Sequence, residues 1–243
     1  MMLTKCLAVV FLATLAVAEV PSFIPICGRR NPNMEKCLLD ATNSLRDRLK
    51  AGIPEIGLAP QDPRHIEKFT LSDTDAMRAV ARNVTIRGMG DFIAETMQHD
   101  PKAHQFHTVM RFKKLILDGE YDVNAKIIVP INGHGPIHVE ADDVVTDIVM
   151  KYKFVKINGA NHVRYVSVTT SLSLKNWSAV FEPSATMDST LVTAINAALE
   201  GSRKEMFEVL KPNVEKIISQ MTMDIANKVH EHFTFDELFP DRE

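Results

Sequence analysis

A change of hydrophobic period divides the chain into a region of strands and a region of helix, and it limits the fold more than any other feature. Residues 69–177 alternate between apolar and polar side chains and are rich in β-branched types, a pattern typical of strands. Beyond Pro183 apolar residues recur every three or four positions, which predicts helix. Long strands joined by short turns form an antiparallel, strongly curved sheet, and its apolar face can hold a helix. We therefore expect an α+β fold.

Two Asn-Gly dipeptides predict tight turns between strands. Both residues of such a pair tolerate positive φ, so Asn158-Gly159 and Asn132-Gly133 each indicate a hairpin. The second pair also begins a Gly-x-Gly sequence, which occurs in phosphate-binding loops. That alternative needs a third glycine and a following helix, but His138 occupies the required position and the next residues alternate like a strand. We predict a hairpin there rather than a nucleotide-binding loop.

The predicted C-terminal helix is apolar over much of its circumference. Pro212 is expected to kink it or to begin its second part, because proline costs least at the first position of a helix. After Pro212 one broad stripe contains Val214, Ile217, Ile218, Met221, Ile225 and Val229. A shorter helix is predicted for residues 33–52, and a segment rich in proline and glycine follows it up to residue 63.

The first eighteen residues have the three parts of a secretory signal peptide. Lys5 supplies the basic part, an apolar run follows, and Ala16-Val17-Ala18 provides the small residues of a cleavage site. We expect cleavage after Ala18, secretion into an extracellular fluid, and one domain formed by residues 19–243.

Cysteine usage agrees with an oxidising compartment. Cys6 leaves with the signal peptide, and Cys27 and Cys37 remain as an even pair. We predict a disulfide between them that joins the N-terminal arm to the first helix. Asn83 and Asn176 each begin an Asn-x-Ser/Thr sequence, so both can accept an N-linked glycan if they lie on the surface.

Charge and hydropathy exclude two kinds of partner. The whole chain carries 28 basic and 31 acidic residues, and loss of Lys5 changes the net charge from -3 to -4 (27 − 31). The charges are spread evenly, which argues against nucleic acid as a partner. No stretch after the signal peptide reaches eighteen apolar residues, so we expect no stable insertion into a membrane.

The sequence contains no recognisable catalytic or metal-binding motif. It lacks both the G-x-S-x-G elbow of common hydrolases and the H-E-x-x-H pattern of zinc proteases. His99, His104 and His107 form the sole histidine cluster, and we interpret them as solvated residues of a polar bend rather than as metal ligands. We expect neither an enzyme nor a cofactor nor a metal.

Several motifs occur in an order that resembles the takeout and juvenile hormone-binding protein family of insects. They are residues 27–37, residues 52–63, residues 121–135, and "DELFP" after the long helix. The resemblance implies a highly curved antiparallel sheet wrapped around a long C-terminal helix, the super-roll also found in lipid-transfer domains of the bactericidal/permeability-increasing type. It further implies an apolar tunnel between sheet and helix that holds one elongated, lipid-like ligand.

One difference from the juvenile hormone-binding proteins in the narrow sense indicates which branch of the family the chain resembles. Haemolymph juvenile hormone-binding proteins in the narrow sense have a second disulfide, and this chain has no further cysteine after Cys37. It is therefore similar to the takeout-like branch, which includes clock-controlled and feeding-related members and whose ligands are often unknown. The implied function is a secreted carrier of a small hydrophobic ligand, either a juvenile hormone-like terpenoid or a fatty-acyl lipid, with an unidentified receptor as a further partner. A secreted interaction protein with a filled core is the alternative.

The ligand-facing residues follow from the strand alternation and the helix stripe. On the strands we predict Leu115, Leu117, Ile127, Val129, Val166, Val168 and Leu172, together with Tyr121 and Tyr152, whose hydroxyl groups can orient a ligand. On the helical side we predict Met206, Leu210, Ile217, Met221 and Ile225. Strand register decides this set, because a slip of one residue reverses every inward assignment.

Overall fold

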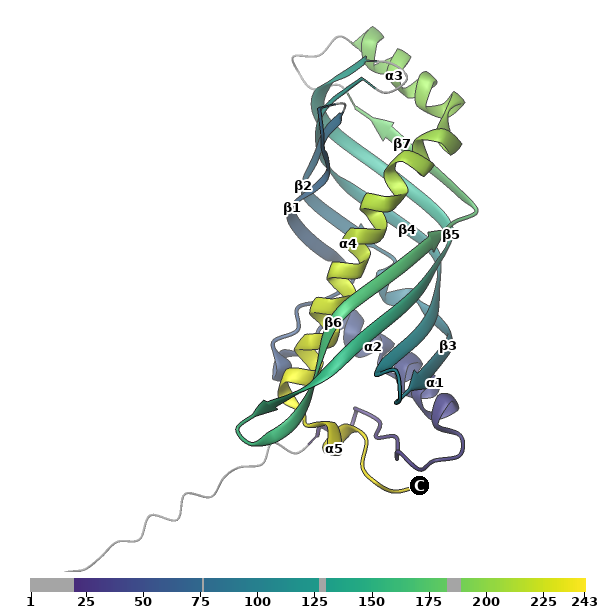
Figure 1. Cartoon of the computed structure of the whole chain (residues 1–243). Helices are drawn as coiled ribbons and strands as arrows, with labels where there is room; N and C mark the ends of the chain where they lie inside the picture. The colour runs from purple at the N-terminus through teal and green to yellow at the C-terminus, as the bar shows by residue number, and fades with distance from the viewer. Residues whose placement is uncertain (1–19, 76, 127–129, 183–188) are drawn as a thin grey trace, which may run out of the picture.

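A seven-stranded antiparallel sheet curls around one long helix (Figure 1). The structure is a computed structural model and describes residues 20–75, 77–126, 130–182 and 189–243. Its strands are β1 (Arg64–Asp73), β2 (Met77–Arg87), β3 (Ile93–Asp100), β4 (Gln105–Lys126), β5 (Pro130–Ile157), β6 (Ala160–Ser173) and β7 (Asn176–Phe181). Its helices are α1 (Met34–Ser44), α2 (Arg46–Ala51), η1 (Pro54–Ile56), η2 (Met89–Asp91), α3 (Ser189–Gly201), α4 (Arg203–His232) and α5 (Phe235–Leu238).

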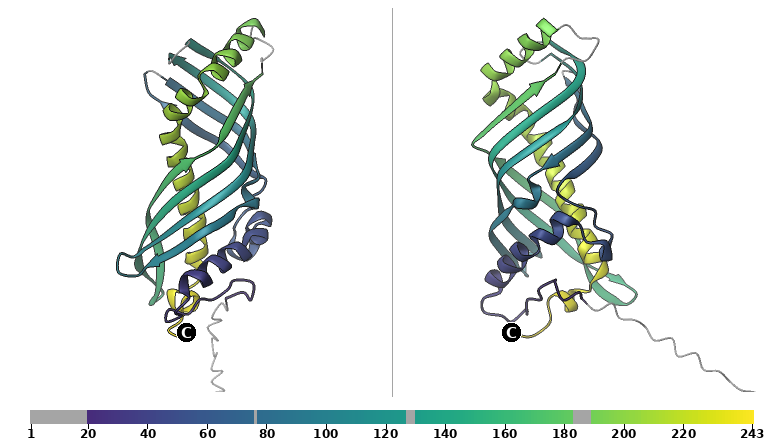
Figure 2. Two further views of the ribbon diagram at one scale, coloured as in Figure 1. Left: turned by 90° about the vertical axis from the view of Figure 1, so that its right-hand side faces the viewer. Right: turned by 180° about the vertical axis from the view of Figure 1, so that it is seen from behind.

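Two very long strands form the centre of the sheet. β4 has 22 residues and β5 has 28, and the two pair along their whole length. The order across the sheet is β1-β2-β4-β5-β6, while β3 pairs with β4 and β7 pairs with β5. Strands of this length accumulate so much right-handed twist that the sheet coils (Figure 2). The predicted α+β fold, with a curved antiparallel sheet around a C-terminal helix, is confirmed.

The prediction of a hairpin turn at Asn132-Gly133 is wrong. Asn132 pairs with Asn124 inside the β4–β5 ladder. The pair at the end of the ladder where β4 ends and β5 begins is Lys126 with Pro130. The alternation of β5 continues through the dipeptide, so pairing with β4 overrides its local preference for a turn. The other dipeptide, Asn158-Gly159, does form the predicted turn, since both residues have positive φ between β5 and β6.

The second part of the C-terminal helix does not begin at Pro212. α4 runs without a break from Arg203 to His232 and contains Pro212 in its interior. The division falls at Ser202, where α3 ends, and the two helices meet at an angle (Figure 1). The helix predicted for residues 33–52 is likewise two shorter helices, α1 and α2, which meet at Leu45.

The core is filled at one end of the molecule. Buried residues from α1, β5, β6, α5 and the segment before α1 pack together there, and the aromatic rings of Phe106, Tyr152 and Phe239 lie within this cluster. The predicted disulfide between Cys27 and Cys37 is present and belongs to the same cluster. We call this region the filled end.

Three helices attach to the edges of the sheet through asparagine side chains. The Asn227 side chain of α4 accepts a hydrogen bond from Tyr165 N (2.8 Å) and donates one to Tyr165 O (3.2 Å). Asn196 of α3 bonds Phe181 in the same way, and Asn43 of α1 bonds Ala94. Each carboxamide therefore satisfies the free backbone groups of one edge-strand residue.

Candidate functional site

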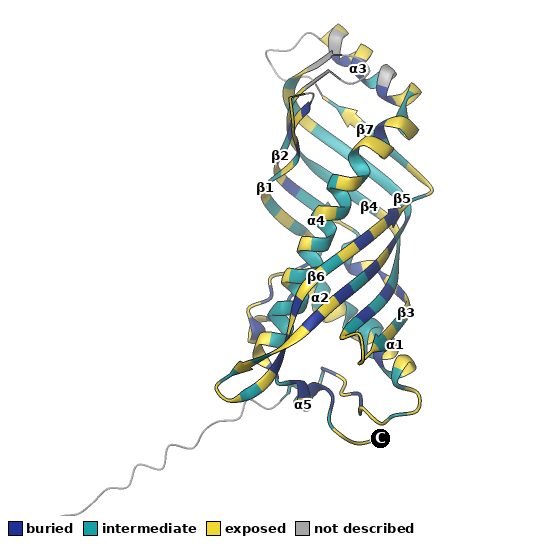
Figure 3. Ribbon diagram, viewed as in Figure 1, coloured by how far each residue is buried: buried dark blue, intermediate teal, exposed yellow. Residues whose placement is uncertain are grey.

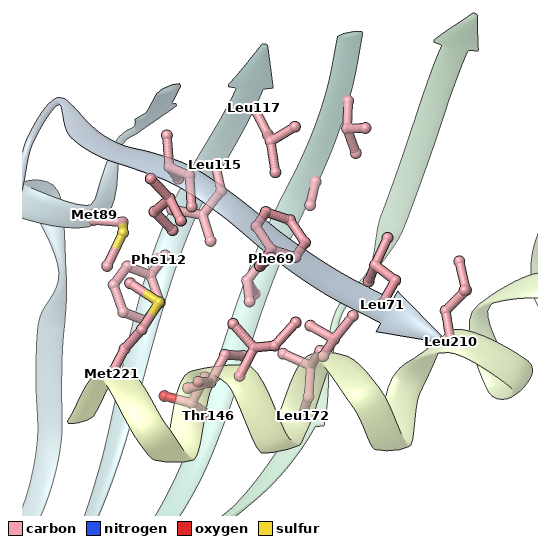
Figure 4. Close-up of a pocket in the computed structure, with 18 of the residues that line it drawn as sticks. Phe69, Leu71, Met89, Phe112, Leu115, Leu117, Thr146, Leu172, Leu210 and Met221 are labelled. Carbon is pink, nitrogen blue, oxygen red and sulfur yellow. The ribbon is translucent and has the colours of Figure 1, made fainter. Parts of the chain in front are cut away.

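A cavity of about 550 Å³ lies between α4 and the concave face of the sheet. Side chains from α4 and from the strands point into this space from opposite sides (Figure 4). α4 packs loosely here, since Met206 is its one buried residue and most of its length is coloured as intermediate or exposed in Figure 3. α4 lies along β6, and β1, β2, β4, β5 and β7 contribute side chains to the rest of the wall.

The cavity wall is almost entirely apolar. No described lining residue carries a charge, and the polar side chains are Thr42, Gln61, Tyr121, Thr146, Trp177 and Thr222. Several of their donors are already bonded to backbone carbonyls: Thr42 to Leu38 (2.8 Å), Gln61 to Ala59 (2.5 Å), Thr146 to Met110 (3.5 Å) and Trp177 to Arg203 (3.2 Å). Such a wall favours an apolar guest over water, because water finds few partners in it.

Tyr121 lies in the cavity wall as predicted. Its side chain is buried, and its ring packs edge-on against Phe181 with centroids 4.6 Å apart. Burial raises the pKa of the Tyr121 phenol above its usual value. The hydroxyl group is therefore protonated at neutral pH.

Most of the predicted ligand-facing residues line the cavity. From the strands these are Leu115, Leu117, Tyr121 and Leu172, and from α4 they are Met206, Leu210, Ile217, Met221 and Ile225. Ile127 and Val129 lie outside the described residues, so their predicted placement is not addressed. A ligand contact at any of these positions remains a prediction.

Val166 and Val168 do not line the cavity. Lys151 pairs with Ser167 and Tyr152 pairs with Tyr165, so Val166 is an extra residue in a β-bulge of β6. The bulge reverses the alternation, and Val166 faces outward with 52% exposure. Val168 packs against the filled end instead. The predicted inward orientation of Val166 is wrong because the sequence pattern gives no sign of the bulge.

Tyr152 also lies at the filled end rather than in the cavity wall. Its hydroxyl group is 2.9 Å from His99 Nε2, and the His99 ring stacks on Phe106. Burial lowers the pKa of His99, which keeps the imidazole neutral. The interpretation of His99 as a solvated residue is therefore wrong. His107 instead contacts Asp147 at 2.9 Å, and the described residues contain no group of ligands suited to a metal.

Sequence reasoning missed the wall formed by β1 and by the segment after β2. Phe69 and Leu71 of β1 and Met89 of η2 all line the cavity (Figure 4). The alternation of Phe69 and Leu71 was a usable signal for this face. Met89 has no such signal, because it lies in a 3-10 turn that only the tertiary fold brings over the cavity.

Both glycan acceptors predicted from the sequence are accessible. Asn83 and Asn176 are exposed, Asn83 in a bulge of β2 and Asn176 at the start of β7. In the part of the chain that the structure describes, no helix combines the length and the apolar character needed to span a membrane.

Comparison with known proteins identifies a family and solved structures of similar architecture. A family model described as haemolymph juvenile hormone binding protein (JHBP) matches residues 6–240. The crystal structure of Epiphyas postvittana Takeout 1 matches with a TM-score of 0.73 at 16% sequence identity, covering 89% of this chain and 99% of that one. A lipopolysaccharide binding protein matches at 10% identity over 77% of this chain and 38% of that one, with a TM-score of 0.35 that is too low to establish a shared fold. No curated protein sequence matches the chain.

A sheet curled around a long C-terminal helix with an apolar cavity between them defines a protein of the takeout architecture. Within that class, the chain belongs to the haemolymph juvenile hormone binding protein family, whose model matches nearly all of its length. The family resemblance predicted from the motifs is confirmed.

Proposed function

We propose that this protein is a secreted carrier that holds one small, elongated hydrophobic molecule in the cavity beside α4. A juvenile hormone-like terpenoid and a fatty-acyl lipid are the two ligand types that we consider. The observation that carries this proposal is a space of about 550 Å³ without a charged residue among its described lining. Ligand pockets usually measure about 300–1,000 Å³, so the volume suits a single small lipid.

The size of the cavity favours a carrier over an interaction protein with a filled core. Well-packed interiors contain few voids larger than one water molecule. Filling this space with an apolar ligand would remove apolar surface of both partners from water, which contributes about 25 cal/mol per Å² before the costs of ordering. In this proposal the protein binds its ligand without transforming it, because the sequence contains no recognisable catalytic motif.

Three features support a location outside the cell. The N-terminal residues fit a signal peptide that is removed after Ala18, which would leave one domain of residues 19–243. The Cys27–Cys37 disulfide fits an oxidising compartment. The matching family is described as haemolymph proteins.

The test is recovery of the natural ligand. The protein is expressed with its signal peptide, purified from the medium under native conditions and extracted with organic solvent, and the extract is examined by mass spectrometry. We expect an intact apolar molecule at about one equivalent per chain. An empty extract, together with failure of the extracted protein to bind the apolar dye Nile red, would overturn the carrier function.

A further inference from the structure

Methionine side chains contribute to the cavity wall from several elements. The chain has 12 methionines, and Met1 and Met2 belong to the expected signal peptide, so ten remain (12 − 2). Six of these ten are among the described residues of the wall: Met77, Met89, Met110, Met150, Met206 and Met221. They belong to β2, η2, β4, β5 and α4. The wall therefore carries thioether side chains on the sheet side and on the helix side.

Three of the six methionines are only partly buried. Met89, Met110 and Met221 have intermediate exposure, and Figure 4 labels Met89 and Met221 in the wall. A side chain that borders a cavity is not enclosed by neighbours on every side, so it can change rotamer. Methionine is unbranched, has three rotatable bonds and fits irregular apolar shapes. These three side chains can therefore reshape the wall.

The backbone that carries these side chains is well fixed. Met110 lies in the middle of the sheet, where it pairs with Ala94 of β3 and with Thr146 of β5. Met221 lies on α4, whose Asn227 side chain bonds the backbone at the edge of β6. Adjustment to a ligand is therefore expected from the side chains rather than from the strands or α4.

The polar groups of the wall do not favour one head group over another. Tyr121, Thr146 and Thr222 carry hydroxyl groups, and a hydroxyl group can both donate and accept a hydrogen bond. The remaining polar residues already donate to backbone carbonyls. No described lining residue carries a charge, so a buried ionised head group would be costly. The shape of the apolar chain is left as the property on which the wall can select.

We propose that the cavity accepts straight, bent and branched neutral lipids of similar size with similar affinity, because Met89, Met110 and Met221 adapt the wall to each shape. This inference rests on the proposed carrier function and adds the class of ligand. That class is a range of terpenoid and fatty-acyl chains rather than one molecule of fixed shape. Methionine-rich surfaces are used in the same way by proteins that bind many partners.

The test uses two pairs of geometric isomers that differ in shape alone. One pair is the cis and trans forms of 9-hexadecenol, and the other is the all-trans and all-cis forms of farnesol. Each alcohol competes with Nile red for the solvent-extracted protein. The members of a pair have the same head group and the same composition, so a difference in affinity reports fit to the wall. We expect the two affinities within each pair to agree within about threefold.

Replacement of the flexible side chains should make the cavity selective. In the cavity variant, Met89, Met110 and Met221 are all changed to leucine, which has a similar volume but is branched and less flexible. This swap is among the best tolerated in apolar interiors, so the variant should fold. We expect at least one isomer pair to separate by about tenfold or more, because a stiffer wall fits one shape better than the other.

Three other methionines provide a matched control. They are partly buried in the same way but pack against the filled end: Met34, Met97 and Met223. The filled-end variant, with all three changed to leucine, should keep both isomer pairs within about threefold. An equal separation of isomers by the two variants would show that the cavity methionines are not responsible.

A second measurement uses the unaltered protein, so it decides the question even if the cavity variant does not fold. Methionine methyl groups are labelled with carbon-13, and their signals are assigned with single Met→Leu variants. The shift of such a methyl group depends on its rotamer. We expect the signals of Met89, Met110 and Met221 to differ between the complexes with the two isomers of a pair, while those of Met34 and Met97 coincide.

The results separate the inference from the carrier function. A parent protein that separates the isomers of either pair by more than about threefold would overturn the inference and leave the carrier function in place. A folded cavity variant without added selectivity, or cavity methyl signals that are identical in all complexes, would show that the methionines do not adapt the wall. Failure of all four alcohols and of Nile red to bind would overturn the carrier function itself.

Discussion

At the scale of single residues, His230 of α4 is a titratable group held in a neutral state. Its Nδ1 atom lies 2.9 Å from Ala226 O, and its Nε2 atom is buried without a hydrogen-bond partner among the described residues. Its ring packs edge-on against Tyr165 at 5.1 Å. Burial lowers the pKa of His230 from 6.5 to about 4, because a charged imidazolium would lose its hydration there.

This depressed pKa predicts a loss of stability in acid. The unfolded chain binds a proton near pH 6.5 and the folded chain only near pH 4, so the His230 contribution is complete above 6.5 and is lost as pH falls toward 4. The full loss is on the order of 3 kcal/mol. His230→Phe keeps a ring and removes the titration, so thermal unfolding between pH 7.5 and 4.5 should decline less steeply than in the parent. Equally steep curves would contradict this role.

The wall residue Met221 allows the openness of the cavity to be tested. Enlarging a well-packed core residue costs about 1–3 kcal/mol, but an indole at Met221 can occupy empty space instead. We expect Met221→Trp to lower affinity for Nile red and for long apolar ligands at least about tenfold, while the ligand-free protein unfolds at nearly the same temperature. Met223→Trp is the control on the same helix, because Met223 packs against the filled end, and it should leave affinity unchanged. A Met221→Trp variant that unfolds readily or binds normally would contradict the cavity at this position.

Single-residue orientation was predictable only where a strand stays regular. Leu115, Leu117 and Leu172 were placed correctly from simple alternation. Val166 was not, because an inserted bulge residue changes which side chains face inward without changing the composition of the strand.

At the scale of secondary structure, the helices are held to the sheet by polar contacts as well as by apolar packing. Along one side of α4, Asn227 bonds the backbone of Tyr165, Glu215 accepts from Leu172 N (2.8 Å) and Ser219 bonds Thr170 (2.9 Å). These contacts fix α4 along the edge of β6. The apolar stripe is therefore free to face the cavity.

Removal of the Asn227 side chain tests this attachment. In Asn227→Leu both backbone groups of the buried residue Tyr165 lose their partners, so we expect a loss of about 2 kcal/mol or more in the free energy of unfolding. Urea unfolding followed by circular dichroism measures this loss. Asn161→Leu is the control on β6, because Asn161 is exposed, and it should change stability by less than about 0.5 kcal/mol. Equal effects of the two substitutions would contradict the attachment.

The hydrophobic period predicted which segments are strands and which are helices, but it did not predict where one element ends and the next begins. The strands after residue 69 and the long helix follow directly from the two periods. Asn132-Gly133 failed as a turn because a local preference is weaker than a ladder of more than twenty residues. Pro212 failed as a helix start because the apolar stripe continues on both sides of it and keeps α4 against the sheet.

At the scale of the whole molecule, the filled end has a packed core, whereas the remaining part of the sheet and α4 enclose the cavity. The filled end contains the disulfide, and the segment before α1 meets the C-terminal segment there, since Arg29 N donates to Pro240 O (2.9 Å) and Arg30 N to Arg242 O (3.0 Å). The cavity begins beyond it and extends toward α3. Sequence pattern cannot distinguish these regions, because both consist of inward-facing apolar residues. The distance between sheet and helix, which depends on the twist of every strand, decides which region is filled.

This division predicts that stability and binding can be separated. The disulfide closes a loop with a sequence separation of 10, and a loop of this size contributes about 3 kcal/mol by restricting the unfolded chain. In a Cys27→Ala, Cys37→Ala double variant we therefore expect a melting temperature about 5–10 °C lower. Neither cysteine lines the cavity, so the affinity for Nile red should stay within about twofold at a temperature where both proteins are folded. A large loss of affinity in the folded variant would show that the filled end shapes the cavity rather than merely stabilising the chain around it.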